Sequence, residues 1–139
     1  MRVLVDTNIV LDLLLDREPF ATPAAKLAAA IETGLLTGYL CATSVTTIDY
    51  LLAKNLGAAK ATRAVSSLLS LFEIASVNRV VLENALQAGF SDFEDAVIHE
   101  AACHTGADAL VTRNLKDFLS ATLPVYTAAD LLALLQAKQ

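Results

Sequence analysis

Four aspartates lie at positions where an α/β chain usually places its chemistry. Asp6 directly follows the apolar run Val3–Val5, and Asp95 lies near the start of a later helical stretch. Asp117 comes shortly after another apolar run, and Asp49 lies on a helical stretch in the first half of the chain. Carboxylates gathered in one pocket repel each other unless their oxygens coordinate a hard divalent cation. These residues therefore predict a Mg²⁺ or Mn²⁺ site.

Hydrolysis of a phosphodiester is the reaction that such a site favours. A divalent cation lowers the pKa of its water, orients the phosphodiester and stabilises the leaving oxygen, and two ions lie about 4 Å apart in the fuller mechanism. The formal net charge of −5 argues against a protein that holds nucleic acid through its overall field. Local cations would have to line the path of the backbone, and the candidates are Arg17, Lys54, Arg113 and Lys116.

Short apolar runs alternate with helical patterns along the whole chain. The predicted strands are Val3–Val5, Tyr39–Ala42, Phe72–Val77, Ala109–Val111 and Pro124–Tyr126. The predicted helices cover residues 9–15, 20–33, 43–56, 58–71, 79–88, 91–104 and 127–137. This alternation predicts an α/β fold with a parallel sheet and right-handed crossovers. The carboxyl ends of parallel strands share one edge, which is where the functional crevice of such sheets lies.

Polar residues mark the expected starts of several helices. Thr22 followed by Pro23 is typical of a cap with proline at the first helical position. Ser91 with Glu94 three residues later has the form of a capping box. The other predicted caps are Asn78 and Thr127.

Size and composition favour one domain covering residues 1–139, of a size that buries roughly two thirds of its unfolded surface. The longest uncharged stretch, residues 33–48, is too short and too polar to span a bilayer. Cys41 and Cys103 are too few for a disulfide framework and are expected to be buried thiols. Because the start of the chain lacks the pattern of a secretory signal, we expect a cytoplasmic protein.

Three motifs, in this order, resemble those of the PIN domain family. They are Val3–Asn8, Asp92–Ala96, and Leu110–Asn114 with Asp117 and Phe118 behind it. The resemblance spans nearly the whole chain. It implies a three-layer αβα sandwich with a short parallel sheet of four to five strands, and the activity of a metal-dependent ribonuclease. Many small PIN proteins of this length are the toxins of toxin–antitoxin pairs, which extends that possibility to this chain.

The resemblance also implies roles for individual residues. Asp6 and Asp95 match the first and third acids of the family, and Asp49 is the only acid available for the second. Asn114 stands where the family often has aspartate, so Asp117 is expected to supply that charge. Carried over in this way, the catalytic residues are Asp6, Asp49, Asp95, Asn114 and Asp117. The metal ligands are Asp6, Asp95 and Asp117, and the substrate-binding residues are Asn8, Thr112 and Arg113.

Simpler roles compete with these at several positions. Asp6 could be only a helix cap, Asp49 an ordinary solvent-facing residue, and Asp117 the cap of a short turn. Asp92 and Glu94 more often serve a helix N-terminus, where negative charge is favourable. His99 is more often packed or solvent-facing than functional.

The expected partners are RNA, single-stranded in the simplest case, and an antitoxin protein. The Ala- and Leu-rich stretches 24–36 and 127–137 offer apolar surface for a homodimer or for such a partner. The competing function is a PIN-like scaffold that binds RNA or protein after losing full activity. A phosphatase with a nucleophilic aspartate is weaker, because no second aspartate follows Asp6 two residues on.

Overall fold

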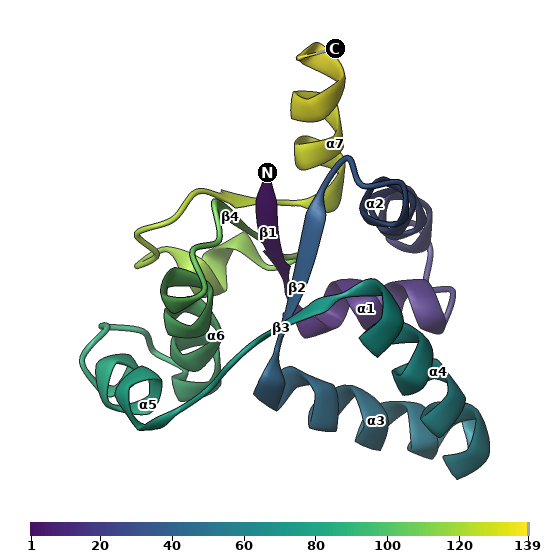
Figure 1. The fold of residues 1–139 in the computed structure, drawn as a ribbon, viewed down its shortest axis with the longest axis horizontal. Helices are drawn as coiled ribbons and strands as arrows, with labels where there is room; N and C mark the ends of the chain where they lie inside the picture. Colours follow the sequence, from purple (N-terminus) through teal and green to yellow (C-terminus); the bar gives the residue numbers. More distant parts are fainter. Residues whose placement is uncertain (139) are drawn as a thin grey trace.

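A computed structural model describes residues 1–138 and contains one five-stranded sheet at its centre (Figure 1). All four neighbouring pairs are parallel, and the strand order is β3-β2-β1-β4-β5. The strands are β1 (Arg2–Val5), β2 (Thr37–Cys41), β3 (Glu73–Ala75), β4 (Ala109–Val111) and β5 (Val125–Tyr126). The predicted α/β class with four to five parallel strands is confirmed.

Helices cover both faces of this sheet and complete three layers. One face packs against α1, α2, α3, α4 and α7, and the other against α5, α6 and the short 3₁₀ helix η1. In Figure 1, α5 and α6 lie on one side of the strands, and α1, α3 and α4 on the other. The helices are α1 (Thr7–Leu14), α2 (Ala21–Glu32), α3 (Ala42–Leu56), α4 (Ala58–Leu71), α5 (Arg79–Leu86), α6 (Phe93–His104), η1 (Leu115–Phe118) and α7 (Ala128–Ala137).

The central strand β1 is buried on both faces, as its unbroken apolar sequence predicts. Val3 and Val5 point into one core, while Leu4 points into the other, and none of the three is more than 1% exposed. Val5 is in register with Val111 of β4, so the chain leaves both strands at the same edge. This edge places the residues after β1 beside those after β4.

Two predicted helix caps are wrong by one or two residues. Asp92, not Ser91, caps α6, because its side chain accepts bonds from the backbone N–H groups of Glu94 and Asp95. Helix α2 begins before Thr22, whose hydroxyl donates to Glu18 instead of capping the helix. The predicted caps Asn78 and Thr127 are confirmed by bonds to the first turns of α5 and α7. Across residues 1–138, every helix is too short or too polar to cross a membrane.

Candidate active site

Asp6 is the first residue beyond β1 and connects that strand to β4 and α1. Its backbone N–H donates to the carbonyl of Val111 at 2.9 Å. One carboxylate oxygen accepts the N–H of Thr7 at 2.8 Å, and the other accepts the hydroxyl proton of Thr112 at 2.8 Å. The carboxylate therefore does cap α1. Each oxygen keeps a further lone pair, so capping leaves room for a metal ligand role.

The environment of Asp6 disfavours its negative charge. Burial raises the pKa of the Asp6 carboxyl above its ordinary value, and the charges of Glu94 and Asp117 raise it further. The hydrogen bonds from Thr112 and Thr7 oppose this rise in the pKa. A buried carboxylate that also faces like charges is stable only when a cation or a proton compensates it.

Asp95 lies in the first turn of α6, half-buried, and belongs to the same acidic group. Burial and the charges of Asp92, Asp6, Asp117 and Glu94 raise the pKa of Asp95 to about 7. The structure thus brings Asp6, Asp95 and Asp117 within electrostatic reach of one another. Glu94, expected only to serve the helix N-terminus, joins this cluster because its charge acts on both Asp6 and Asp95. We call Asp6, Glu94, Asp95 and Asp117 the acidic cluster.

The donor atoms of the acidic cluster have the chemistry that suits a hard divalent cation but are not gathered around one point: among residues 1–138, only His99, Glu100 and Cys103 bring three possible ligand atoms within 4.8 Å of one another. The donor atoms of the acidic cluster are all carboxylate oxygens, which Mg²⁺ and Mn²⁺ prefer. Among residues 1–138, no lysine, arginine or histidine forms an ion pair with any member of the cluster. The cluster therefore retains uncompensated negative charge, and this unpaired charge is the physical property that a cation site requires.

Two residues predicted to bind substrate also hold the two loops of this edge together. Thr112 is fully buried, and its hydroxyl oxygen also accepts the N–H of Asn114 at 3.1 Å. Thr112 therefore positions Asp6 and Asn114, and its contact with substrate stays a prediction. The side-chain oxygen of Asn8 accepts the N–H of Arg113 at 3.3 Å. Asn114 itself is exposed at the start of η1, where it can reach a substrate.

Asp49 is the predicted catalytic residue whose place in the site stays a prediction. It lies about two turns into α3 and is exposed, next to the buried Ile48. The charges that act on Asp95 come from Asp92 and from the acidic cluster, and Asp49 is not among them. The helical phase of α3 directs Ile48 and Leu52 to the core, which leaves Asp49 on the solvent side.

Sequence reasoning missed a second buried acid, Asp12 of α1. Its side chain is 0% exposed and pairs with Arg17, whose Nε lies 2.9 Å from one carboxylate oxygen. Nε of Arg113 lies 3.5 Å from the other oxygen. Asn8 and Asp12 are four residues apart and share one helix face, so both contact Arg113. A lone acid inside the apolar run 9–15 was the signal for it.

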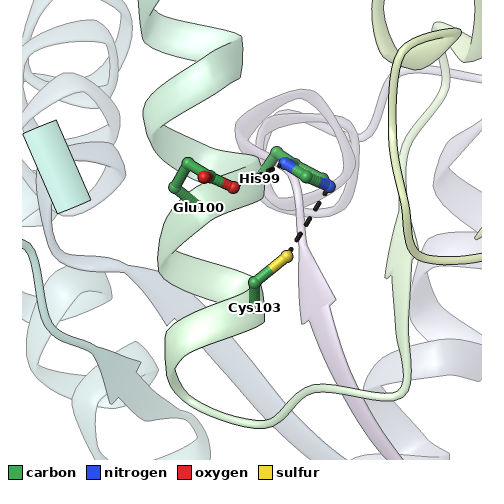
Figure 2. Close-up of side chains that lie close together, drawn as sticks. All are labelled: His99, Glu100 and Cys103. Atoms are coloured by element: carbon green, nitrogen blue, oxygen red, sulfur yellow. Dashed lines mark hydrogen bonds and ion pairs between the residues drawn. The ribbon is translucent and has the colours of Figure 1, made fainter. Parts of the chain in front are cut away.

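A second group of possible metal ligands lies further along α6 and consists of His99, Glu100 and Cys103 (Figure 2). Nδ1 of His99 lies 2.9 Å from Glu100, and Nε2 lies 3.6 Å from the sulfur of Cys103. Nε2 already accepts the backbone N–H of Thr122 at 3.0 Å, which assigns the proton of the neutral ring to Nδ1. The ring also packs on Phe90. We infer that this group has a structural role and packs α6 against the segment after η1.

The order of these motifs agrees with a family model described as PIN domain, which matches residues 2–116. The chain belongs to the PIN domain family. No curated protein sequence matches it significantly. The family model includes the segments that carry Asp6, Asp49, Asp95 and Asn114, and it ends one residue before Asp117.

Solved structures of other PIN domains show the same fold. FitAcB from Neisseria gonorrhoeae is 22% identical, with a TM-score of 0.72, and the match covers 91% of this chain and 98% of that one. A toxin–antitoxin complex from Klebsiella pneumoniae is 25% identical, with a TM-score of 0.68 and coverage of 91% and 97%. VapC20 of Mycobacterium tuberculosis, described as a toxin that cleaves the sarcin–ricin loop, is 16% identical, with a TM-score of 0.63 and coverage of 78% and 86%. These likenesses confirm the predicted PIN-like three-layer sandwich.

Proposed function

We propose that this PIN domain is a metal-dependent endoribonuclease that hydrolyses phosphodiester bonds of single-stranded RNA. The observation that carries the proposal is the acidic cluster, whose carboxylates have no ion-pair partner in the part of the chain that the structure describes. It lies at the edge where β1 and β4 end, the usual place for a functional crevice.

Within this proposal, Asp6, Asp95 and Asp117 hold Mg²⁺ or Mn²⁺. When bound, the cation lowers the pKa of a water molecule and offsets the charge of the phosphodiester. Thr112 fixes the Asp6 carboxylate through its hydroxyl, and Thr7 fixes it through its backbone N–H. Asp95, whose pKa is about 7, would have to be deprotonated to serve as a ligand. The protein itself supplies no covalent nucleophile.

A hollow of about 490 Å³ beside the cluster offers room for the RNA backbone. Asp117 and Asn114 lie in its wall next to Arg113 and the exposed Lys116. These two cations provide the local positive charge that single-strand binding needs on a protein of net negative charge.

The test is cleavage of a mixed panel of single-stranded RNAs by the purified protein with Mg²⁺ or Mn²⁺. We expect Asp6→Asn and Asp95→Asn each to lose more activity than the roughly 10- to 100-fold that removal of an outer-shell partner typically causes. Glu32→Gln, an exposed acid at the end of α2, is the matched control. Asp49→Asn then decides whether Asp49 belongs to the site, because retained cleavage would place it outside.

A different outcome would favour the scaffold function. If the wild type cleaves none of the RNAs and its melting temperature is the same with and without metal, the acidic cluster is not a working metal site. The domain would then act by binding alone, and the exposed position of Asp49 and the asparagine at position 114 agree with that outcome.

We further propose that the nuclease is the toxin of a toxin–antitoxin pair and acts in the cytoplasm as a homodimer. Its support is the likeness to FitAcB and to the Klebsiella pneumoniae toxin–antitoxin complex. Expression should arrest growth, Asp6→Asn should not, and a small protein encoded next to it should relieve the arrest. Growth that is unaffected by an active nuclease would contradict this role.

A further inference from the structure

An apolar pocket shares Arg113 and Thr127 with the hollow that contains Asp117, and the proposed hydrolysis does not use it. Its volume is about 290 Å³, close to the lower limit of roughly 300 Å³ for small-ligand sites. Ile9, Pro19, Phe20 and Ala128 supply apolar walls. Arg113 lines both this pocket and the hollow that contains Asp117, so the two cavities meet at its side chain.

Arg113 is held in place at the wall of this pocket. Its guanidinium carbon lies 4.4 Å from the centre of the Phe20 ring, a cation–π distance. Its Nε lies 3.5 Å from Asp12, and its backbone N–H donates to Asn8. Among residues 1–138, its two terminal nitrogens have no hydrogen-bond partner. The structure thus presents a flat, fixed donor group to the pocket.

Two buried polar atoms at this wall lack a hydrogen bond within the described chain. They are one carboxylate oxygen of Asp12 and Nε of Arg113. The Asp12 side chain is 0% exposed, so the oxygen has no access to bulk solvent. The two atoms lie 3.5 Å from each other as an ion pair, so they hold Arg113 against Asp12 and leave its two terminal nitrogens to donate to a ligand.

The chemistry of the walls restricts the ligand to a flat heterocycle that carries acceptors. Apolar side chains and an arginine stacked on a ring suit an unstacked base, which proteins bind by stacking and by its hydrogen-bonding edges. Arginine donates only, and guanine offers two adjacent acceptors, O6 and N7, that match a guanidinium. Adenine presents one acceptor and one donor on the same edge, and the donor would face the arginine.

We propose that this pocket binds a guanine base next to the scissile phosphate, with Arg113 and Phe20 as the specificity-determining residues. This inference rests on the proposed ribonuclease function and adds sequence preference to it. Asp12 and Asn8 act as positioning residues because both hold Arg113.

Mapping of cleavage sites in a random-sequence RNA tests the base preference. The wild type should favour guanine at one fixed position beside the cut by at least about fivefold, the lower limit for one arginine–guanine pair. Arg113→Met and Phe20→Ala should abolish that preference. Lys116→Met is the matched control, since loss of a phosphate contact weakens binding evenly across sequences and leaves the preference unchanged. Cleavage without any base preference would overturn the pocket assignment and leave the nuclease standing.

A second measurement does not depend on cleavage. GMP, AMP, CMP and UMP are titrated into the metal-free protein while NMR resonances of Ile9 and Phe20 are followed. We expect GMP alone to shift them in the wild type and to lose this effect in Arg113→Met. GMP-specific shifts without RNA cleavage would support the guanine pocket and contradict the ribonuclease activity. Equal shifts by all four nucleotides, or none, would overturn the inference and leave the pocket to an apolar side chain of a protein partner.

Discussion

At the scale of single residues, the position of an acid after a strand or at a helix start was a better guide to the candidate site than its residue type. Asp6 and Asp95 could be found from the sequence because one follows a buried strand and the other opens a helix. Asp12 gave only the signal of a lone acid in an apolar run, and its partner Arg113 could not be predicted because it is distant in sequence. Asp49 stays a prediction, since the sequence offered it as the only acid on α3 and the structure shows it exposed.

Thr112 offers a test of how Asp6 is prepared for its role. Its hydroxyl donates to Asp6 at 2.8 Å and lowers the pKa of that carboxyl against the effect of burial. In Thr112→Val the pKa of Asp6 should rise further, so its protonated form persists to higher pH. We expect RNA cleavage to fall about 10- to 100-fold at neutral pH.

The pH profile separates this explanation from simple loss of packing. The acidic limb of the profile should move to higher pH in Thr112→Val, and Thr112→Ser, which keeps the donor, should leave it in place. A valine variant with reduced activity but an unmoved acidic limb would contradict the role of the hydroxyl.

At the scale of elements, the start of helix α6 is encoded in the local sequence, whereas its packing depends on a residue that is distant in sequence. The tandem Ser91 and Asp92 gave two candidate caps, and sequence reasoning chose the first. The structure uses Asp92, whose oxygen lies 2.8 Å from the nitrogen of Glu94 and 3.3 Å from that of Asp95. The length of α6 was predictable from its pattern. The bond from Thr122 to His99, which holds the following segment against the helix, joins residues too far apart in sequence for a local pattern.

The cap predicts different consequences for two neighbouring substitutions. Asp92→Ala removes the acceptor of two backbone N–H groups and should lower the free energy of unfolding by about 1 kcal/mol. Ser91→Ala should change it by less than about 0.5 kcal/mol, as is usual for surface substitutions. Urea unfolding at pH 5 is the appropriate measurement, because the raised pKa of Asp95 keeps that residue protonated there. Equal losses in both variants would contradict the assignment of the cap.

At the scale of the whole molecule, the sheet order brings together residues that the sequence keeps apart. The β1–β4 pair unites Asp6 with the segment after Val111, more than 100 positions later. The alternation of strands and helices predicted a parallel sheet whose carboxyl ends share one edge. It could not predict which loop residues would pair, because Asn8, Asp12 and Thr112 find their partners only through the register of the strands.

The acidic cluster also predicts how the stability of the whole domain depends on pH and metal. The pKa of Asp95 is about 7 in the folded protein, above its ordinary value of 3.8. The folded state therefore binds more protons than the unfolded state between these values, and stability falls as pH rises through them. This contribution is complete below about pH 4 and is lost above pH 7 in the metal-free protein.

Divalent metal should reverse this trend, because it binds the ionised carboxylates of the folded state alone. A metal at 100 times its dissociation constant stabilises by about 2.7 kcal/mol. We expect Mg²⁺ or Mn²⁺ to raise the melting temperature at pH 8 and to have little effect at pH 5, and EDTA to remove the gain. Asp95→Asn should flatten the dependence of the metal-free protein on pH, and Asp49→Asn should leave it as in the wild type. The same metal effect at both pH values, or an unchanged pH dependence in Asp95→Asn, would mean that the cluster does not couple proton and metal binding to folding.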